Sequence, residues 1–365
     1  KIEPPGTGDP VRGWRELDEG TSLWWRSLGR NKRSVALDLR KEEGRDIARD
    51  LAAHCDVLIE NFRPGRMEAW GLGPEDLRAL SPGLVYTRVS GYGQDGPLAD
   101  RRGFASVCEA FAGLRYVTGH PGETPVRANL SLGDSLAAFQ AVIGTLLALL
   151  RRERAPEGRG QVVDVSIMEA VLNVMEAAVS EADRCGVVRQ PSGTTITGVV
   201  PTDAYPCADA KHVVIGANGD SIFERLMQTA ERQDLAADAR LATNADRVLH
   251  QEEIDTAIAA WTGTLACAEV VARLSAAGVP AAPIHSAKDL LENEQVRARG
   301  QLEEVQVGGR PLQLPAIGPR LSETPGRTDH PGGALGADSD AVLVEVLGLS
   351  TQRVAELRRQ GVIGA

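Results

Sequence analysis

The sequence predicts an α/β protein with a larger domain built on a parallel β-sheet and a second, smaller α/β domain. A strand, loop, helix, strand order runs between residues 56 and 89, and this order is typical of parallel sheets. A stretch rich in Thr, Gly and Pro at residues 186–200 then precedes a second set of strands and helices. We expect a large domain over residues 1–190, a small domain over 200–300, and a segment at 301–365 that crosses back to the large domain.

The elements of the larger domain follow from hydrophobic periodicity. Alternating or continuous apolar residues predict strands, and apolar residues at helical spacing predict helices. The expected strands cover residues 35–39, 56–60, 84–89 and 161–165, and the expected helices cover 43–55, 74–80, 104–114 and 167–185. Loops at residues 61–65 and 91–97 follow the second and third strands. Because ligands of parallel sheets bind beyond the carboxyl ends of the strands, these loops are candidate ligand contacts.

The later part of the chain has its own elements. The pattern predicts a hairpin at residues 203–216, helices at 220–229, 251–262 and 267–277, a strand at 279–284, a strand pair at 303–314, and helices at 338–347 and 351–360. The crossings at residues 186–200 and 318–336 are long and rich in Gly and Pro. Connections of this length can reach around a second subunit, so we expect an obligate homodimer.

Bulk properties exclude several protein classes. The 365 residues are 42% hydrophobic and 25% charged, which is ordinary for a globular protein with a large core. The formal charge of −10 argues against general nucleic-acid binding, which needs a basic face. We find no signal peptide and no uninterrupted apolar run of about 18 residues, so we expect no membrane association.

The cysteines indicate a reducing compartment. There are five, an odd number, and none forms a Cys-x-x-Cys pair, which favours free thiols over disulfides or zinc. We therefore expect a cytoplasmic protein without a metal. The chain begins at Lys1 without a methionine, and we expect that an N-terminal segment precedes it.

A Gly133-Asp134-Ser135 turn opens the longest apolar run, which continues to Leu150 and is closed by two arginines. Apolar residues fall on every side of the predicted helix, so we expect it to be buried all round. Asp134 then has two interpretations. It can form a capping box with Ser131, or it can be an ionised carboxylate held at a helix N-terminus for chemistry.

Several motifs together carry a family resemblance. They are NKRSVALDL at residues 31–39, DVLIENFRPG at 56–65, GLG at 71–73, LVY at 84–86, SGYGQDGP at 90–97, GD at 133–134 and GRGQVVD at 158–164. In this order they resemble the class III CoA-transferases, which include formyl-CoA:oxalate and crotonobetainyl-CoA:carnitine CoA-transferases and the 2-methylacyl-CoA racemases. The resemblance covers nearly the whole chain. It implies a Rossmann-like large domain, a smaller α/β domain and an interlocked homodimer, with the family's first strand and helix absent here.

The resemblance also implies a mechanism and a site. Asp134 matches the nucleophile that passes CoA from an acyl-CoA to a carboxylic acid through an anhydride and an aspartyl-CoA thioester. The family's CoA-contacting segments match Leu37, Asp38, Leu39, Arg40, Asn61, Phe62, Arg63, Arg102, Gly103, Phe104 and Ala105. CoA enters as a substrate, and no metal is implied. Arg63, Arg66 and Arg102 are candidates for the CoA phosphates, because Arg binds phosphate through paired donors.

Trp14, Trp24 and Trp25 fall in the segment that lines the family's acyl site. Three indoles predict an acyl group larger or less polar than oxalate or formate, since a small dianion calls for Arg or backbone donors. They can instead pack between subunits. The sequence does not name the acid.

Two other functions stay open. A racemase needs two proton-transfer groups at the α-carbon. The racemase branch has a His where this chain has Gly103-Phe104-Ala105, a segment without a His, and His120 falls in a Pro-Gly turn. An acyl-CoA-binding protein without turnover is the third possibility, because the first strand and helix are absent and the loop at 197–201 has a single glycine.

Overall fold

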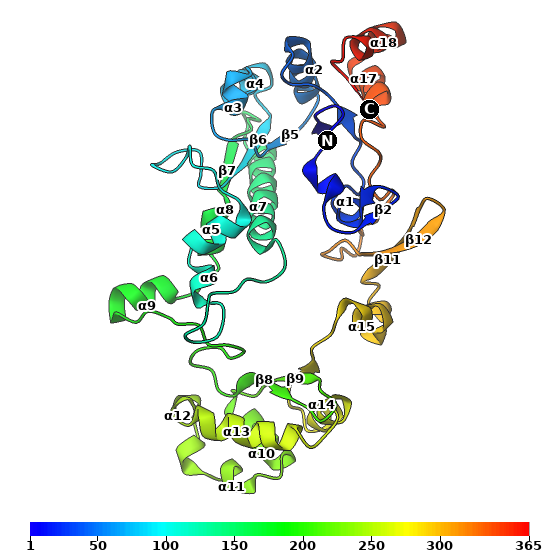
Figure 1. Ribbon diagram of the computed structural model, residues 1–365. Coiled ribbons are helices and arrows are strands. Elements are labelled where there is room, and N and C mark those ends of the chain that lie inside the picture. Colours follow the sequence, from blue (N-terminus) through cyan, green and yellow to red (C-terminus); the bar gives the residue numbers. More distant parts are fainter. Residues whose placement is uncertain (365) are drawn as a thin grey trace. The chain divides into compact units, whose positions relative to one another are not determined.

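The main sheet has three parallel strands in the order β5–β6–β7 (Figure 1). The strands are β5 Val57–Glu60, β6 Val85–Ser90 and β7 Val162–Ser166. β6 lies in the middle, and its Val85, Tyr86 and Thr87 have no exposed surface, as expected for a strand with neighbours on both sides and covered faces. The expectation of a parallel sheet is confirmed.

The computed structural model describes residues 1–364, which fall into two compact units. The first combines Lys1–Cys108, Gly133–Ala170 and Leu290–Ala365, and the second combines Glu109–Leu132 and Val171–Asp289. Residues 109–132 and 171–190, which the sequence analysis placed with the large domain, are grouped with the second unit.

Most remaining elements of the first unit are short. They are β1 Ile2–Glu3, a 3-10 turn at Pro10–Gly13, β2 Leu17–Asp18, β3 Thr21–Ser22, α1 Leu23–Leu28, β4 Val35–Ala36, α2 Glu42–Ala53, α3 Arg66–Ala69, α4 Pro74–Leu80, α16 Glu294–Ala298, β11 Leu302–Val307, β12 Arg310–Pro315, α17 Ser339–Leu347 and α18 Thr351–Arg359. The expected strand at 35–39 is thus shorter, whereas the strand pair around Gly308 and Gly309 is confirmed. One core joins α2, α4, β4 and β6 with α17 and α18, through residues such as Leu37, Leu51, Tyr86, Leu343 and Leu357.

The longest helix is α7, which spans Leu132–Arg154. Its buried residues are small and fall at helical spacing: Gly133, Ala137, Ala141, Thr145 and Ala148. This narrow face lies on the sheet, because a Cβ added at Gly144 would stand 2.6 Å from the Val163 side chain of β7. Small residues allow a helix and a sheet to approach this closely.

The opposite face of α7 corrects two expectations. It exposes a row of large apolar residues, each between 42% and 66% exposed: Phe139, Val142, Ile143, Leu146, Leu147 and Leu150. The prediction of a helix buried all round is therefore wrong for the single chain. By length and composition α7 could also cross a membrane, contrary to the expectation that the chain has no such segment, although the core helix of a soluble protein passes the same test.

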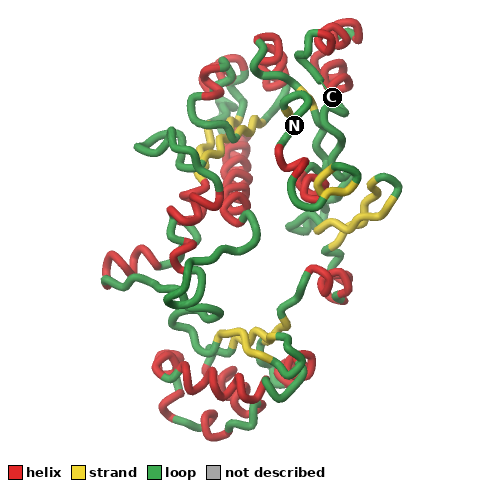
Figure 2. Tube along the Cα trace, viewed as in Figure 1, coloured by secondary structure: helices red, strands yellow, loops and turns green. Residues whose placement is uncertain are grey.

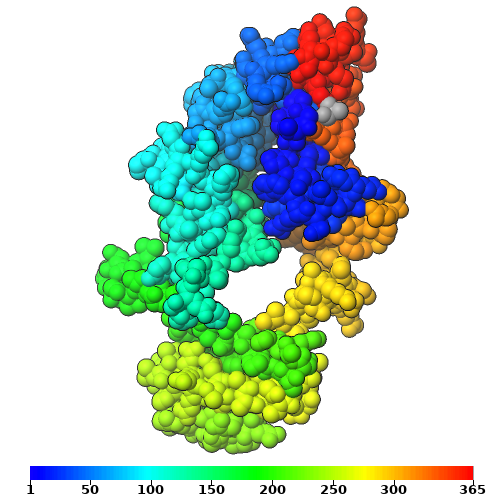
Figure 3. Space-filling view, viewed as in Figure 1, coloured from blue at the N-terminus to red at the C-terminus, as the bar shows by residue number. Residues whose placement is uncertain are grey.

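The start and end of the first unit are joined by what we call the terminal clasp, which consists of Glu3, Arg12, Ser34, Asp338 and Ser339. The backbone N–H of Ser34 donates to Asp338 at 2.8 Å, and the N–H of Ala36 donates to the Ser339 hydroxyl at 3.0 Å. Arg12 donates two hydrogen bonds of 2.8 Å to the carboxylate of Glu3, which is 2% exposed. Figure 3 shows the N-terminal (blue) and C-terminal (orange and red) segments side by side.

The second unit has an antiparallel sheet in the order β10–β9–β8 (Figure 2). Its elements are α6 Leu114–Val117, α9 Ala178–Cys185, β8 Thr202–Pro206, β9 His212–Gly216, α10 Asp220–Thr229, α11 Gln233–Ala236, a 3-10 turn at Ala239–Leu241, α12 Asn244–Leu249, α13 Gln251–Thr262, α14 Cys267–Ala276 and β10 Ala281–Pro283. The hairpin, the three helices and the strand expected between residues 203 and 284 are confirmed. Arg247 has no exposed surface and donates to the carbonyls of Val200 and Leu241 and to Asp220, so its burial is compensated.

Four helices within residues 1–364 cross a boundary between the units in sequence: α5 Ala105–Phe111, α8 Ile167–Leu172, α15 Ala287–Glu292 and, by its first residue Leu132, α7. The single helix expected at residues 167–185 is wrong, because α8 ends at Leu172 and α9 begins at Ala178. Between them Glu176 takes a positive φ of 51°, which a right-handed helix cannot accommodate. Arg189 holds this break by pairing with Glu176 at 2.8 Å.

Candidate active site

Three charged residues form a row across the main sheet at its carboxyl edge. Arg88 of β6 is in register with Glu60 of β5 on one side and with Asp164 of β7 on the other. The Nε of Arg88 donates to Glu60 at 2.8 Å, and a second guanidinium nitrogen donates to Glu68 of α3 at 2.6 Å. Glu60 and Arg88 are 5% and 6% exposed, so their charges compensate each other inside the protein.

The carboxylates of this row hold the two loops that follow β5 and β6. Glu60 accepts the backbone N–H of Phe62 at 2.7 Å, and Asp164 accepts the N–H of Gln94 at 3.1 Å. The Ser90 hydroxyl accepts the N–H of Gly93 at 2.9 Å. Both loops, residues 61–65 and 91–97, are thus held by hydrogen bonds to side chains of the sheet.

The electrostatics of the row follow from burial and from Arg88. Burial raises the pKa of Glu60, although the hydrogen bond from Arg88 opposes the shift. Burial is also the largest single effect on Glu68, but the hydrogen bond and charge of Arg88 together with backbone hydrogen bonds outweigh it and lower the pKa of Glu68. Burial raises the pKa of Asp164, and the charge of nearby Glu169 adds to the increase. One Arg88 charge acts on three carboxylates, so it does not fully compensate the cost of burying the negative charge of each one.

Helix α7 runs antiparallel to the strands and crosses the sheet from edge to edge. Near its C-terminal end Arg152 pairs with Asp56 at 2.9 Å and donates to the carbonyl of Gly83 at 3.1 Å. Asp56 and Gly83 lie just before β5 and β6, so this end of α7 is at the amino edge of the sheet. The N-terminal end therefore points to the carboxyl edge, where the loops that follow β5 and β6 begin.

Asp134 lies beyond that edge, in the first turn of α7, and its side chain is exposed. The hydroxyl of Thr145 on α7 hydrogen-bonds that of Thr87 in β6 at 2.7 Å, which fixes the helix against the strand. Eleven residues of helix separate Thr145 from Asp134, about 16 Å, whereas β6 continues only about 10 Å from Thr87 to Ser90. The helix N-terminus favours the ionised form of a carboxylate.

The structure brings two of the predicted CoA-contacting segments together. Arg63 donates to the carbonyl of Asp100 at 2.7 Å, and a Cβ on Gly91 would stand 2.9 Å from the Cα of Gly103. The loops at 61–65 and 91–103 therefore touch.

Within these segments, exposure separates the side chains that can reach a ligand. Asn61, Phe62, Arg63, Arg102 and Phe104 are exposed, whereas Ala105 is 5% exposed and Gly103 is half-buried. The ring of Phe62 meets that of Trp70 edge-on at a centroid distance of 5.2 Å, and the guanidinium of Arg66 lies 4.4 Å from the centroid of the Trp70 ring.

The segment from Leu37 to Arg40 follows β4. Leu37 is 1% exposed and Asp38 is 7% exposed, while Leu39 is half-buried. Arg40 donates to Asp38 at 2.8 and 2.9 Å, and these hydrogen bonds lower the pKa of Asp38. Only Leu39 and Arg40 present side-chain surface for a ligand here.

The three tryptophans have different surroundings. Trp25 is 2% exposed, lies under the guanidinium of Arg12 at 3.7 Å and donates its indole N–H to Gly333. Its ring is used by the fold. Trp14 is 53% exposed, and its ring centroid lies 5.9 Å from that of Trp24. Only Trp14 and Trp24 have ring surface available to an acyl group.

Sequence reasoning missed Glu60, Glu68, Arg88 and Asp164 as parts of this site. A signal was present, because Arg88 interrupts the otherwise apolar or small strand Val85–Ser90. A charged residue inside a central strand must be paired, which predicts acidic partners on the neighbouring strands.

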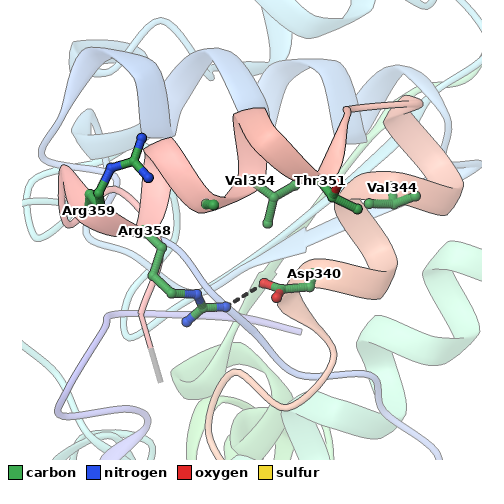
Figure 4. Close-up of a pocket in the computed structure, with 7 residues that line it drawn as sticks. Asp340, Val344, Thr351, Val354, Arg358 and Arg359 are labelled. Carbon is green, nitrogen blue, oxygen red and sulfur yellow. Dashed lines mark hydrogen bonds and ion pairs between the residues drawn. The ribbon is translucent and has the colours of Figure 1, made fainter.

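A separate hollow of about 340 Å³ lies between α17 and α18 (Figure 4). It is lined by Asp340, Val344, Thr351, Val354, Ala355, Arg358 and Arg359, and Arg358 pairs with Asp340 across it. None of the predicted site residues lines this hollow. Within residues 1–364 no group of three or more His, Cys, Asp or Glu side chains is arranged to hold a metal ion.

Known proteins match the chain over most of its length. The model of CoA-transferase family III matches residues 1–339. The succinyl-CoA–D-citramalate CoA-transferase of Chloroflexus aurantiacus is 44% identical over 367 aligned positions, which cover 100% of this chain and 90% of that protein. The succinyl-CoA:glutarate CoA-transferase of Mus musculus is 30% identical, covering 100% of this chain and 83% of that protein.

A solved structure agrees. The crystal structure of a CAIB/BAIF family protein from Brucella suis superposes with a TM-score of 0.81 at 28% identity, covering 94% of this chain and 90% of that chain. Together with the parallel sheet and the sequence motifs, these matches identify the chain as a member of CoA-transferase family III and as a transferase enzyme.

Proposed function

We propose that the enzyme moves CoA between an acyl-CoA thioester and a carboxylic acid, with Asp134 as the nucleophile. The observation that carries the proposal is the position of Asp134. Its exposed carboxylate lies in the first turn of a 23-residue helix, past the carboxyl edge of the sheet and on the side of the two ligand loops. The helix dipole keeps the carboxylate ionised and therefore nucleophilic.

In the proposed sequence the Asp134 carboxylate attacks the thioester carbonyl, the C–S bond breaks, and a mixed anhydride and a CoA thiolate form. The thiolate then attacks the aspartyl carbonyl of the anhydride, which releases the donor acid and leaves an aspartyl-CoA thioester. The acceptor carboxylate reverses these steps and regenerates Asp134. No net proton is required, because each step exchanges one anion for another.

CoA itself is assigned to the two loops. The exposed Phe62 and the Arg66–Trp70 pair offer flat surfaces for an adenine ring, and Arg63 and Arg102 offer cations for phosphate. Leu39 and Arg40 supply the remaining contacts of the proposed CoA site, while the buried Leu37, Asp38 and Ala105 support the backbone there. Within these segments Phe104 stands where a racemase needs a proton-transfer group, and a phenyl ring cannot carry a proton, so the racemase is not proposed.

The acyl groups are proposed to be dicarboxylic, with four or five carbons. The relatives at 44% and 30% identity are named for succinyl-CoA with D-citramalate or glutarate, all of them dicarboxylic acyl groups or acids. Trp14 and Trp24 offer the larger surface that a chain longer than oxalate needs.

Replacing Asp134 with Ala tests the function. The variant is expected to lose exchange of labelled CoA between an acyl-CoA and free acids, while mass spectrometry of the wild type incubated with succinyl-CoA shows CoA bound to Asp134. Exchange near the wild-type rate would show that Asp134 is only a helix cap, whose loss lowers stability by about 0.5–2 kcal/mol. Binding of acyl-CoA without exchange against any acid would instead favour a protein that binds without turnover.

We further propose a cytoplasmic homodimer with a Rossmann-like large domain. The apolar row on α7, from Phe139 to Leu150, supports the dimer, because an exposed apolar face of this size marks a binding surface. Relatives from Chloroflexus aurantiacus named as alpha and beta subunits of a succinyl-CoA–L-malate CoA-transferase are consistent with assembly of such chains. Light scattering is expected to give twice the 38.8 kDa of one chain. The free thiols fit a reducing compartment, and cell fractionation tests the location.

A further inference from the structure

Arg15 differs from the other arginines near the acyl-site tryptophans. Arg12 pairs with Glu3 at 2.8 Å, Arg26 donates to Gly332 at 2.9 Å, and Arg30 donates to Ser27 at 2.8 Å. All three are used by the fold. Arg15 is exposed, and within residues 1–364 its guanidinium has no hydrogen bond or ion pair to another residue. It is the cation of this segment that is left for a ligand.

The surroundings of Arg15 hold it in place without neutralising it. Its guanidinium lies 4.3 Å over the ring of Trp24, whose centroid is 5.9 Å from that of Trp14. Stacking uses the face of the guanidinium and leaves the N–H groups at its edge able to donate. Within the described part of the chain, the adjacent Glu16 makes no ion pair with Arg15, and the next two acids of the hairpin, Asp18 and Glu19, pair with Arg310 of β12 instead.

The backbone at Arg15 is also fixed in an unusual conformation. Its φ is +59°, a value that side chains with a Cβ rarely adopt. The flanking residues are anchored, because Trp14 donates to the carbonyl of Val11 at 3.3 Å and Leu23 donates to the carbonyl of Glu16 at 3.0 Å. The backbone of Arg15 is thus held in a strained conformation, and its guanidinium has no anionic partner among residues 1–364. Strained residues of this kind cluster at functional sites.

We propose that Arg15 binds the carboxylate at the far end of a dicarboxylic acyl group and thereby selects dicarboxylic over monocarboxylic substrates. The inference rests on the proposed function. Two guanidinium N–H groups match the two oxygens of a carboxylate, and the neighbouring indoles of Trp14 and Trp24 offer apolar surface for the methylene groups of the same acyl chain. A monocarboxylic acyl group leaves Arg15 unpaired and gains nothing from it.

The test compares succinyl-CoA with butyryl-CoA, which has the same carbon count but lacks the second carboxylate. In Arg15→Met, affinity for succinyl-CoA measured by calorimetry, and kcat/KM for exchange, are expected to fall roughly 10- to 150-fold, the range of a hydrogen bond to a charged group. Affinity for butyryl-CoA is expected to stay within about twofold. Arg15→Lys keeps the charge but loses the paired donors, so its loss is expected to be intermediate.

Arg184→Met is the matched control, since Arg184 is an exposed arginine on α9 in the second unit. It should leave both affinities unchanged. If Arg15→Met loses affinity equally for succinyl-CoA and butyryl-CoA, the proposal is overturned and Arg15 contacts CoA itself. If the variant loses affinity for neither, the proposal is also overturned, and Arg15 is a surface residue without a role in binding. The binding comparison stands apart from the transferase proposal, because a wild type that binds succinyl-CoA but exchanges nothing contradicts only the proposed function.

Discussion

The hydroxyls of Thr87 and Thr145 lie 2.7 Å apart in a buried hydrogen bond between β6 and α7. Residues of a strand alternate between its two faces. Thr87 therefore contacts the helix that carries Asp134, while the next residue, Arg88, pairs with Glu60 on the other face and holds the loop at residues 61–65. Two consecutive residues of one strand thus position the proposed nucleophile and the proposed CoA loop.

This pair of hydroxyls gives the first prediction. In Thr145→Val one buried hydroxyl loses its partner, which should lower the free energy of unfolding by about 1–3 kcal/mol. The double variant Thr87→Val with Thr145→Val removes both polar groups and should recover most of that loss. Urea denaturation of the single and double variants measures the coupling, and strictly additive losses would show that the hydrogen bond contributes little.

Arg88 gives the second prediction. In Arg88→Met the buried Glu60 loses its cation, and breaking a buried pair in this way costs about 3–5 kcal/mol. We expect a lower thermal midpoint, and in the folded fraction a higher KM for acyl-CoA, because Glu60 no longer fixes the N–H of Phe62.

Two milder variants separate stability from CoA binding. Glu60→Gln should raise KM without a comparable change in kcat, since it disturbs the loop at residues 61–65 but not Asp134. Glu68→Gln is the matched control, because the Glu68 side chain is 43% exposed and, within residues 1–364, it pairs with the side chain of Arg88 alone. If Glu60→Gln leaves KM at the wild-type value, the row formed by Glu60, Arg88 and Asp164 does not contribute to CoA binding.

The terminal clasp gives a pH prediction. Burial opposes ionisation of Glu3, but hydrogen bonds from Arg12, Asp9 and Ser34 outweigh it and lower the pKa of Glu3 below 4.5. A carboxyl with a lowered folded-state pKa contributes stability above its unfolded pKa, and this contribution is lost as the pH falls through the folded pKa.

The thermal midpoint of the wild type should therefore decrease once the pH drops below about 4.5. Glu3→Gln should have a lower midpoint at neutral pH, and its midpoint should decrease less on acidification, because it lacks this carboxylate. Differential scanning calorimetry between pH 3 and 7 makes the comparison. Parallel curves for the two proteins would mean that other carboxyls account for the acid sensitivity.

The apolar face of α7 gives the fourth prediction. Leu146 lies in this face and is 59% exposed in the single chain. The variant Leu146→Glu should dissociate the proposed dimer, because the partner subunit would bury the new carboxylate without a cation to pair with it. Leu249→Glu is the control, since Leu249 is 81% exposed and lies in the second unit. Sedimentation velocity should give a smaller species for the first variant only. A dimer that persists in Leu146→Glu would place the interface elsewhere.

Local patterns predicted the strands, the loops and the position of Asp134, because these depend on periodicity and turn residues within short windows. Two features were not predictable in this way. The exposed face of α7 looks like that of a core helix in sequence, since an exposed apolar face and a core face have the same composition. The break at Glu176 has a positive φ and an ion pair with Arg189, 13 residues later, and a helical pattern shows neither.

The pairing of Arg88 was missed for a related reason. Its partner Glu60 and its register neighbour Asp164 come from strands that are distant in the sequence, and only the register of the sheet brings the three together. Periodicity places residues on a face, but it does not show which charges on neighbouring strands meet.

The terminal clasp also has a consequence for how the protein is made. The backbone N–H of Ser34 can form its hydrogen bond only after Asp338 has been synthesised, 304 residues later. At a ribosomal rate of about 5–20 residues per second, this interval is roughly 15–60 s. During that time the nascent chain contains Glu3 and the residues of β4, but not the C-terminal residues that bury them in the folded protein. Chaperones that bind nascent chains therefore have a defined period in which this segment is open to them.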